Sequence, residues 1–211
     1  MLPSFRPEHI LFDWDNTLVD SEAGCLKALN AMMTHFHLKP VSAEEYRVLP
    51  PYAMRDFFFK TLPEHQHGEA LEVLQRVTRD PTLQKATPMP YAYDLLQSLQ
   101  QRSIGLSVVS NKEGDLLRRE IHEMGWNPFF TSIIGSGDSL ENKPSPLPLY
   151  AAYGDISSKV WFVGDSFVDM DAAQAAGCTP LYVGDQPVDS PCIATSLQSI
   201  LSHIQDHIPL S

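Results

Sequence analysis

A short apolar run that ends in two aspartates constrains this chain more than any other feature. The run covers Ile10–Phe12, and Asp13 and Asp15 follow it on either side of Trp14. A continuous apolar run of this length is typical of a parallel strand that is buried on both faces. In an open α/β sheet, the residues that follow such a strand face the crevice where ligands bind. We therefore expect both carboxylates at a ligand-binding edge of a sheet.

Two carboxylates that approach one point in space raise each other's pKa unless a cation lies between them. The pair Asp13 and Asp15 therefore predicts a divalent-cation site that also carries a nucleophile or an acid/base group. The alternative is structural, because aspartates are common turn formers at strand ends and Thr17 is suited to cap a following helix. The pair alone does not decide between these interpretations.

The composition argues against several classes of protein. Of the 211 residues, 43% are apolar, which is enough for a buried core and outside the range of disordered chains. Fifteen basic and 26 acidic residues give a net charge of −11, which argues against nucleic acid or an anionic membrane as the partner. Three cysteines without CxxC spacing, and no apolar run as long as a membrane span, predict a reduced cytoplasmic protein.

The part of the chain that follows the aspartates is predicted to be helical. The expected helices cover residues 20–38, a short segment from Ser42, residues 54–62 and residues 63–79. Ser42 with Glu45 three residues later matches a capping box for the short helix. In the last helix, Leu71, Leu74 and Val77 are expected to face inward, and no strand signal appears between residues 20 and 86.

From residue 88 onward, strands and helices are predicted to alternate. Strands are expected at residues 104–109, 131–135, 160–163 and 180–183, and helices from Pro90 and at residues 112–124, 169–176 and 197–207. This alternation predicts an α/β fold with a mostly parallel, Rossmann-like sheet covered on both faces. The helical stretch is too long for an ordinary crossover between strands. We therefore expect a core of residues 1–18 and 87–211 and an inserted helical lid of residues 19–86. The expected hinges are residues 19–20 and 82–90.

Polar side chains also follow other predicted strands. Ser110 and Asn111 come after one strand, Lys143 lies in an irregular loop, and Asp165 and Asp169 come after another strand. Each has a simpler interpretation as a helix cap, a solvated loop lysine or a turn residue. Because the strands run in one direction, however, these residues are expected at the same edge as the first two aspartates. Hard oxygen ligands in such a set suit Mg²⁺, which also takes a phosphate oxygen of the substrate.

With these motifs the chain resembles the haloacid dehalogenase superfamily, in the phosphatase branch similar to phosphoglycolate phosphatases. The matching segments are Asp13–Thr17, Ser110–Lys112, Lys143–Pro144, Gly164–Asp169 and Ala173–Gly177. They span the whole predicted core in the order of the family. A helical insert directly after the first motif also resembles the small helical cap of the family. The resemblance therefore implies a Rossmann-like core with an inserted α-helical cap.

The resemblance also implies a role for each motif residue. Asp13 would attack phosphorus and form an aspartyl-phosphate, and Asp15 would protonate the leaving oxygen and later activate water. Lys143 would restrain Asp13 and bind the phosphoryl group. The implied phosphate-binding residues are Ser110, Asn111 and Lys143, and the implied Mg²⁺ site comprises Asp13, Asp15 through its backbone carbonyl, Asp165 and Asp169. For Asp169, a direct ligand and an indirect partner both remain open.

Two residues depart from the family pattern. Asn16 stands where the family often has glycine, and asparagine tolerates a left-handed backbone better than other non-glycine residues. Trp14 is bulky between two catalytic carboxylates, but its side chain is expected to alternate to the other face and pack there. Neither departure is expected to prevent activity.

The resemblance further implies which reaction is catalysed. Asp15 argues against a dehalogenase, and Gly164–Ser166 favours a phosphatase over a sugar phosphomutase. A phosphonate-cleaving enzyme would need a cap lysine, where this chain offers Arg55. Arg55 is a candidate for holding a substrate carboxylate or a second anionic group, and the alternative is an ordinary surface arginine.

We therefore expect a Mg²⁺-dependent phosphatase that acts on a small phosphorylated metabolite, such as phosphoglycolate or a sugar phosphate. The alternatives are a catalytically slow binding or regulatory protein with this fold, and another phosphotransferase of the superfamily.

Overall fold

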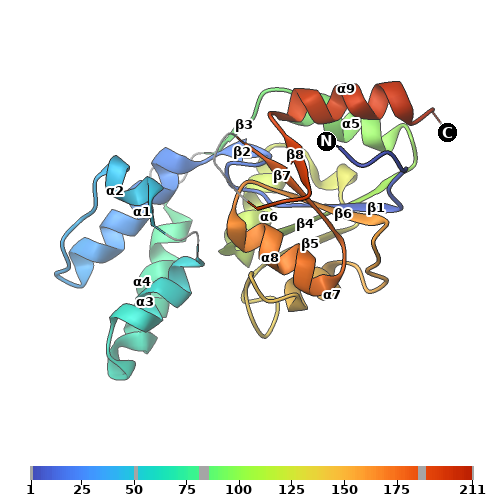
Figure 1. Ribbon diagram of the computed structural model, residues 1–211. Helices are drawn as coiled ribbons and strands as arrows, with labels where there is room; N and C mark the ends of the chain where they lie inside the picture. Colours follow the sequence, from blue (N-terminus) through green and yellow to red (C-terminus); the bar gives the residue numbers. More distant parts are fainter. Residues whose placement is uncertain (1, 50–51, 81–85, 185–188, 211) are drawn as a thin grey trace.

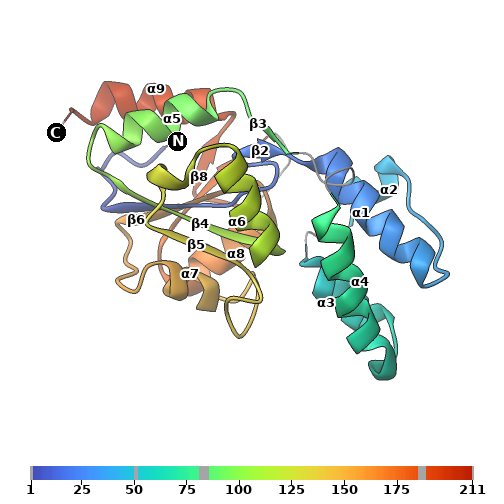
Figure 2. The ribbon, with the colours of Figure 1, turned by 180° about the vertical axis from the view of Figure 1, so that it is seen from behind.

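The structure of the chain, a computed structural model, describes residues 2–49, 52–80, 86–184 and 189–210. Figure 1 shows two bodies side by side, of which one is a sheet covered by helices and the other is entirely helical. The view from behind shows the same division, and the first and last elements of the chain both belong to the sheet body (Figure 2). The helical body is therefore inserted into the chain of the sheet body.

Six parallel strands form the sheet within the described residues, in the order β5-β4-β1-β6-β7-β8. The strands are β1 (His9–Phe12), β4 (Gly105–Glu113), β5 (Ser132–Ser136), β6 (Val160–Gly164), β7 (Thr179–Val183) and β8 (Cys192–Ala194). The central position of β1, between β4 and β6, explains why its apolar run is buried on both faces. The predicted α/β fold with a mostly parallel sheet is confirmed.

Helices cover both faces of this sheet (Figure 1). They are α5 (Ala92–Gln100), α6 (Gly114–Glu123), α7 (Leu147–Ala152), α8 (Phe167–Ala176) and α9 (Leu197–His207). Ile10 and Phe12 belong to the apolar cluster that packs against α5, α6 and α9. Leu11 belongs to a different cluster with α7 and α8. Alternation along β1 thus supplies both faces of the core, as the strand period requires.

The helical body, which we call the cap, has an apolar core of its own. Its helices are α1 (Glu22–His35), α2 (Ala43–Arg47), α3 (Met54–Thr61) and α4 (His67–Arg79), with a 3₁₀ turn at Glu64–Gln66. Phe58 is fully buried at the centre of this core. The capping box predicted at Ser42 is present. The expectation that Leu71 faces inward is wrong, because the buried stripe of α4 runs through Leu74 and Val77 and leaves Leu71 39% exposed.

A two-stranded antiparallel sheet connects the cap to the sheet body. It pairs β2 (Val19–Asp20) with β3 (Thr87–Pro88), at the points where the chain leaves the sheet body and returns to it. These short strands were not predicted, since two residues give no period to recognise. Of the expected hinges, residues 19–20 lie in β2, and residues 82–85 lie outside the described residues.

The prediction that the strand after residue 104 ends at Val109 and that a helix begins at Lys112 is wrong. β4 continues to Glu113, which pairs with Ser136 of β5 beyond a shift in register. The following helix, α6, begins at Gly114, and the Glu113 carboxylate accepts a hydrogen bond from the backbone of Leu116 at its first turn. Lys112 therefore lies at the irregular carboxyl end of a strand, next to the crevice.

Candidate active site

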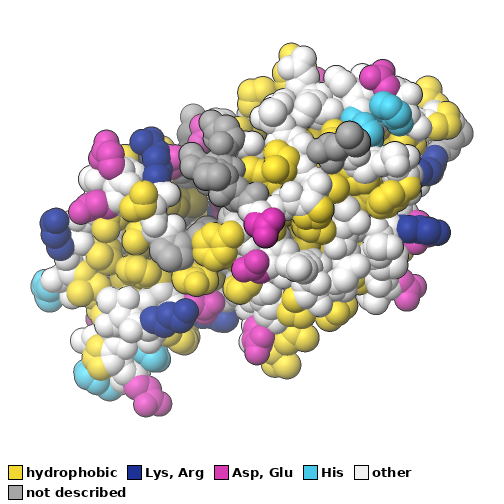
Figure 3. Space-filling model, in the orientation of Figure 1, with side chains coloured by type: hydrophobic (Ala, Val, Ile, Leu, Met, Phe, Trp, Pro, Cys, Tyr) yellow, Lys and Arg dark blue, Asp and Glu magenta, His cyan; other side chains and the backbone are white. Residues whose placement is uncertain are grey.

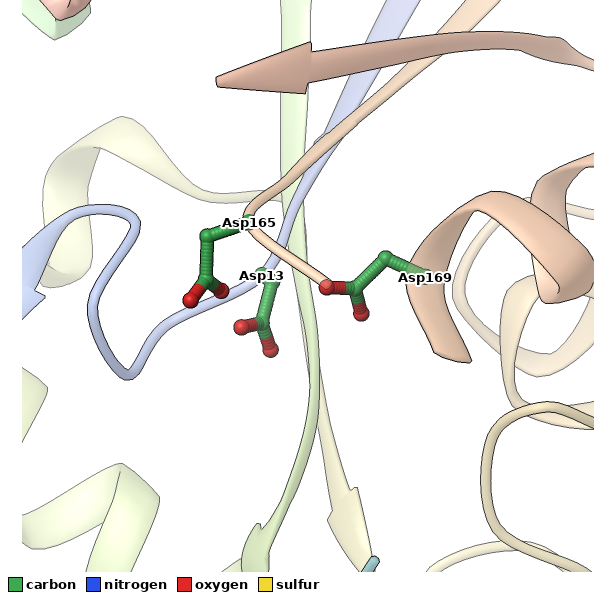
Figure 4. A group of neighbouring side chains, drawn as sticks. All are labelled: Asp13, Asp165 and Asp169. Atoms are coloured by element: carbon green, nitrogen blue, oxygen red, sulfur yellow. The ribbon is translucent and has the colours of Figure 1, made fainter. Parts of the chain in front are cut away.

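Three aspartates converge at the carboxyl edge of the sheet (Figure 4). Asp13 follows β1, Asp165 follows the neighbouring strand β6, and Asp169 lies in the first turn of α8. The backbone N–H of Asp13 donates to the carbonyl of Val163 (2.9 Å), which fixes the first two side by side. A capping box between Ser166 and Asp169 turns the third carboxylate back towards them. One oxygen of each carboxylate lies within 4.8 Å of the others.

Lys143 lies among these carboxylates and is almost completely buried. Its Nζ donates to Asp13 Oδ1 (2.7 Å), to Asp169 Oδ1 (2.6 Å) and to the carbonyl of Val109 (2.9 Å). The side chain of Asn111 holds the backbone of Lys143 on both sides, since its Oδ1 accepts from the lysine N–H and its Nδ2 donates to the lysine carbonyl (both 3.0 Å). Asn111, predicted to bind phosphate, therefore fixes the loop that carries the lysine.

The electrostatics of this cluster favour a cation. Burial raises the pKa of Asp13 to about 7, against the opposing effect of Lys143, and burial also raises the pKa of Asp165. Burial alone would lower the pKa of Lys143, but Asp13 and Asp169 raise it, so the lysine remains charged. Among the described residues, three carboxylates thus share one ammonium, and two negative charges remain when all are ionised. Hard oxygen donors with this excess charge fit a divalent cation such as Mg²⁺.

Asp15 is held by a second set of contacts. Lys112 Nζ lies 2.6 Å from Asp15 Oδ1, and the Ser21 hydroxyl donates to the same oxygen. Trp14 turns to the opposite side and is fully buried in the core, as expected. Asn16 adopts the expected left-handed backbone, with a φ of 58°. Asp13 and Asp15 therefore lie near each other but are restrained by different lysines.

A cavity of about 770 Å³ lies between the sheet edge and the cap, and all the side chains predicted for the site border it. Its size suits a small ligand. On the sheet side, Ser110 is buried and its hydroxyl accepts from the backbone of Lys112 (3.2 Å). On the cap side, Arg55 borders the cavity from α3. Its neighbour Asp56 accepts a hydrogen bond from Asn142 (2.7 Å), which ties α3 to the loop of Lys143.

Two residues of the site had no expected role in chemistry. Thr17, considered as a helix cap, instead donates its hydroxyl to Asp165 Oδ1 (3.1 Å) and so links the first motif to the last. Lys112 was expected in a helix, yet it contacts Asp15. Thr17 belongs to the motif segment Asp13–Thr17, and Lys112 belongs to Ser110–Lys112. Their positions in these segments could have identified them as residues of the site.

Comparisons of the sequence and the fold with known proteins show the family of this chain. The family model of the haloacid dehalogenase-like hydrolases matches residues 10–183. The phosphoglycolate phosphatase of Chromobacterium violaceum is 31% identical, with 89% of this chain and 90% of that protein covered. The phosphoglycolate phosphatase of Neisseria meningitidis serogroup A is 32% identical, with 82% and 79% covered. The crystal structure of a hydrolase of this superfamily from Ehrlichia chaffeensis is 29% identical, covers 97% of this chain and 98% of its own, and has a TM-score of 0.68.

The chain belongs to the haloacid dehalogenase-like hydrolase family. The predicted class of enzyme, a phosphatase that hydrolyses phosphoric monoesters, is confirmed by this membership and by the relatives. The predicted fold, a Rossmann-like core with a helical cap, is confirmed as well. Among the described residues, no helix has both the length and the apolar character needed to cross a membrane. The expected cytoplasmic location stays a prediction.

Proposed function

We propose that this chain is a Mg²⁺-dependent phosphatase that hydrolyses a small phosphate monoester through an aspartyl-phosphate on Asp13. The observation that carries the proposal is the position of the Asp13 carboxylate, which borders a cavity and is buried against Lys143, within 4.8 Å of two further carboxylates. Because curated relatives are phosphoglycolate phosphatases, phosphoglycolate is the first substrate to test.

The chain's own residues would carry out the reaction in two steps. In the first, Asp13 forms an O–P bond as the ester P–O bond breaks, and Asp15 gives its proton to the departing oxygen. In the second, Asp15 takes a proton from water, which attacks phosphorus and releases phosphate from Asp13. Lys143 holds Asp13 Oδ1, which orients Oδ2 towards the substrate, and its charge stabilises the phosphoryl group.

The Mg²⁺ site would be formed by Asp13, Asp165 and the backbone carbonyl of Asp15. When bound, the ion would neutralise the charge of the transferred phosphoryl group. Both oxygens of Asp169 already accept hydrogen bonds, Oδ1 from Lys143 and Oδ2 from Ser166, which favours an orienting role over direct ligation. We further propose that residues 19–86 are the cap domain and that residues 1–18 and 87–211 are the core.

The site offers separate groups for the two ends of a substrate such as phosphoglycolate. The Ser110 hydroxyl and the segment of Asn111 border the cavity beside Asp13 and would bind phosphoryl oxygens. Arg55 borders the same cavity from the cap and would bind the carboxylate, since guanidinium matches a planar anion. The phosphate end would thus meet the sheet edge, and the carboxylate end would meet the cap.

The reaction is tested by phosphate release from phosphoglycolate and from p-nitrophenyl phosphate, with Mg²⁺ and after chelation. We expect release that needs the metal and is lost in Asp13→Asn. The matched control is Asp171→Asn, which changes an exposed aspartate of α8 away from the cavity and is expected to retain activity. Full activity of Asp13→Asn, or full activity of the chelated protein, would contradict the proposal.

The role of Arg55 needs a different comparison of substrates. Ethyl phosphate lacks the carboxylate of phosphoglycolate, so Arg55→Met should lower kcat/KM about ten-fold or more for phosphoglycolate and leave ethyl phosphate nearly unchanged. Arg79→Met, at an exposed arginine of α4, is the matched control. An equal loss on both esters would show that Arg55 does not bind the carboxylate.

A further inference from the structure

A buried set of polar contacts connects Asp15 to helix α6. Lys112 Nζ lies 2.6 Å from Asp15 Oδ1 and 2.7 Å from Glu120 Oε2. Trp14 Nε1 donates to the same oxygen of Glu120 (2.7 Å). Only 3% of the Lys112 side chain and 7% of the Glu120 side chain are exposed, and Trp14 is fully buried. These contacts therefore join the wall of the cavity, where Asp15 and Lys112 lie, to Trp14 in the core.

The stability of the fold does not account for this arrangement. A buried ion pair is often no more stabilising than apolar side chains of similar size, because removing both charges from water is costly. Glu120 Oε1 is buried and has no hydrogen-bond partner within the described part of the chain, which adds to that cost. The other buried side chains of α6, including Leu117 and Ile121, form an ordinary apolar face. Apolar residues in place of both Lys112 and Glu120 would avoid the cost of burying this ion pair.

The geometry instead restrains Asp15 from two directions. Through Lys112, Glu120 holds the carboxylate of Asp15. Through Trp14, whose ring also packs edge-on against Trp126 with centroids 5.8 Å apart, the same Glu120 holds the residue directly before Asp15. Side chain and backbone of the acid/base segment are thus tied to one carboxylate on a helix that is packed on the sheet.

We propose that Lys112 is the positioning residue for Asp15, with Glu120 and Trp14 holding the lysine in place. This inference rests on the proposed function, in which Asp15 protonates the leaving group. The Lys112 ammonium lies between the carboxylates of Asp15 and Glu120, so its contacts suit it to hold Asp15 in place. Its effect is to keep the Asp15 carboxylate aimed at the ester oxygen, within reach for proton transfer.

A misplaced proton donor has a signature that general destabilisation lacks. The p-nitrophenolate ion is a weak base and leaves without a proton, whereas the alkoxide released from phosphoglycolate is strongly basic and needs one. The ratio kcat/KM reports only steps up to cleavage of the ester bond, so the later attack of water does not enter it. Loss of the position of Asp15 should therefore lower kcat/KM much more for phosphoglycolate than for p-nitrophenyl phosphate.

The test compares both esters in Lys112→Met, with Asp15→Asn as the reference and exposed Lys159→Met as the matched control. We expect Lys112→Met to lose about 100-fold in kcat/KM for phosphoglycolate and less than about five-fold for p-nitrophenyl phosphate, the same selectivity as Asp15→Asn. Glu120→Gln, which keeps an acceptor for Trp14 and the lysine, should show a smaller loss of the same kind. In Lys159→Met, both ratios should be unchanged.

A second variant tests whether misfolding explains the loss of activity in Lys112→Met. Lys112→Met combined with Glu120→Leu leaves neither charge of that pair buried alone, and it should fold and show the same selective loss. Equal losses on the two esters, or no loss, in a folded variant would overturn the role of Lys112 while leaving the phosphatase activity established. Failure of the unsubstituted protein to hydrolyse either ester would instead overturn the proposed function, and the role of Lys112 with it.

Discussion

The sheet edge and the cap border the same cavity but contribute to it by different physical means. At the sheet edge, charged side chains are buried and paired, as in Lys143 with Asp13 and Lys112 with Asp15. The cap contributes mainly apolar and aromatic side chains, including Val48, which is 82% exposed, and the space-filling view shows hydrophobic side chains gathered over the cap (Figure 3). Under the proposed function, the sheet edge would supply the chemistry and the cap would select which ester enters.

The largest effect is expected from Lys143 at the sheet edge. Lys143→Met should lower kcat/KM at least about 1,000-fold. Asp13 would lose the side chain that restrains it, and the phosphoryl group would lose contact with the positive charge of the lysine. Exposed Lys159→Met should change it less than two-fold. Circular dichroism and steady-state kinetics on both variants check this. A Lys143→Met enzyme that is folded and within ten-fold of full activity would contradict the role proposed for Lys143.

Large-to-small substitutions test whether the two bodies are held by separate cores. Phe58→Ala in the cap and Leu95→Ala in α5 should each lower the free energy of unfolding by about 3 kcal/mol. After Phe58→Ala, hydrogen exchange should accelerate in α1–α4, while amides of β1 stay protected. Equal acceleration in the sheet and the cap would contradict the proposed division into domains.

At the other end of β1, the buried polar side chain of His9 is neutral, whereas the buried lysines at the sheet edge are paired with carboxylates. His9 stacks on Tyr153 and contacts Ser107 Oγ (2.9 Å), and burial lowers the pKa of His9 from 6.5 to about 4. The unfolded chain therefore binds more protons between these values, so stability should fall as the pH drops from 7 to 5, by roughly 1 to 2 kcal/mol.

Urea denaturation at pH 7 and pH 5 measures this term when the protein is compared with His9→Gln. The variant lacks the titrating ring, so its loss of stability over this range should be smaller by the stated amount. An identical pH dependence of the two proteins would show that His9 does not resist protonation.

The smallest effect is expected on the cap side of the cavity. Val48→Ser should raise KM about three-fold with little change in kcat, since an exposed apolar side chain at the cavity contributes only modest contact area. Leu71→Ser, at a partly exposed residue of α4 away from the cavity, should leave KM unchanged. A large fall in kcat for Val48→Ser would show that this cap residue affects the chemical step.

Long and periodic elements of the fold could be predicted from the sequence. The strand at Ile10–Phe12 and the helix at Leu197–His207 have strong apolar patterns, and both are present. β8 and α7 were not predicted, because one has only three residues and the other begins in a proline-rich segment. The extension of β4 to Glu113 arises from pairing with β5, which no local pattern reveals.

The candidate site was predictable to the extent that its residues lie at strand ends. Asp13, Lys143 and Asp165 could be grouped because parallel strands place their carboxyl ends at one edge. The contacts of Lys112 with Asp15 and Glu120 could not be predicted, since they join a strand end, a loop and a helix without any shared period. The roles of these residues in catalysis stay proposals.

The aspartyl-phosphate on Asp13 can be tested directly by trapping the phosphorylated enzyme. Phosphoglycolate that carries a radiolabelled phosphoryl group would be mixed with the Mg²⁺-loaded protein, quenched in acid within a turnover, and the protein examined by peptide mapping. We expect label on the peptide that contains Asp13, released by hydroxylamine as an acyl phosphate should be, and none in Asp13→Asn. Rapid hydrolysis without any label on the protein, or label on another residue, would contradict it.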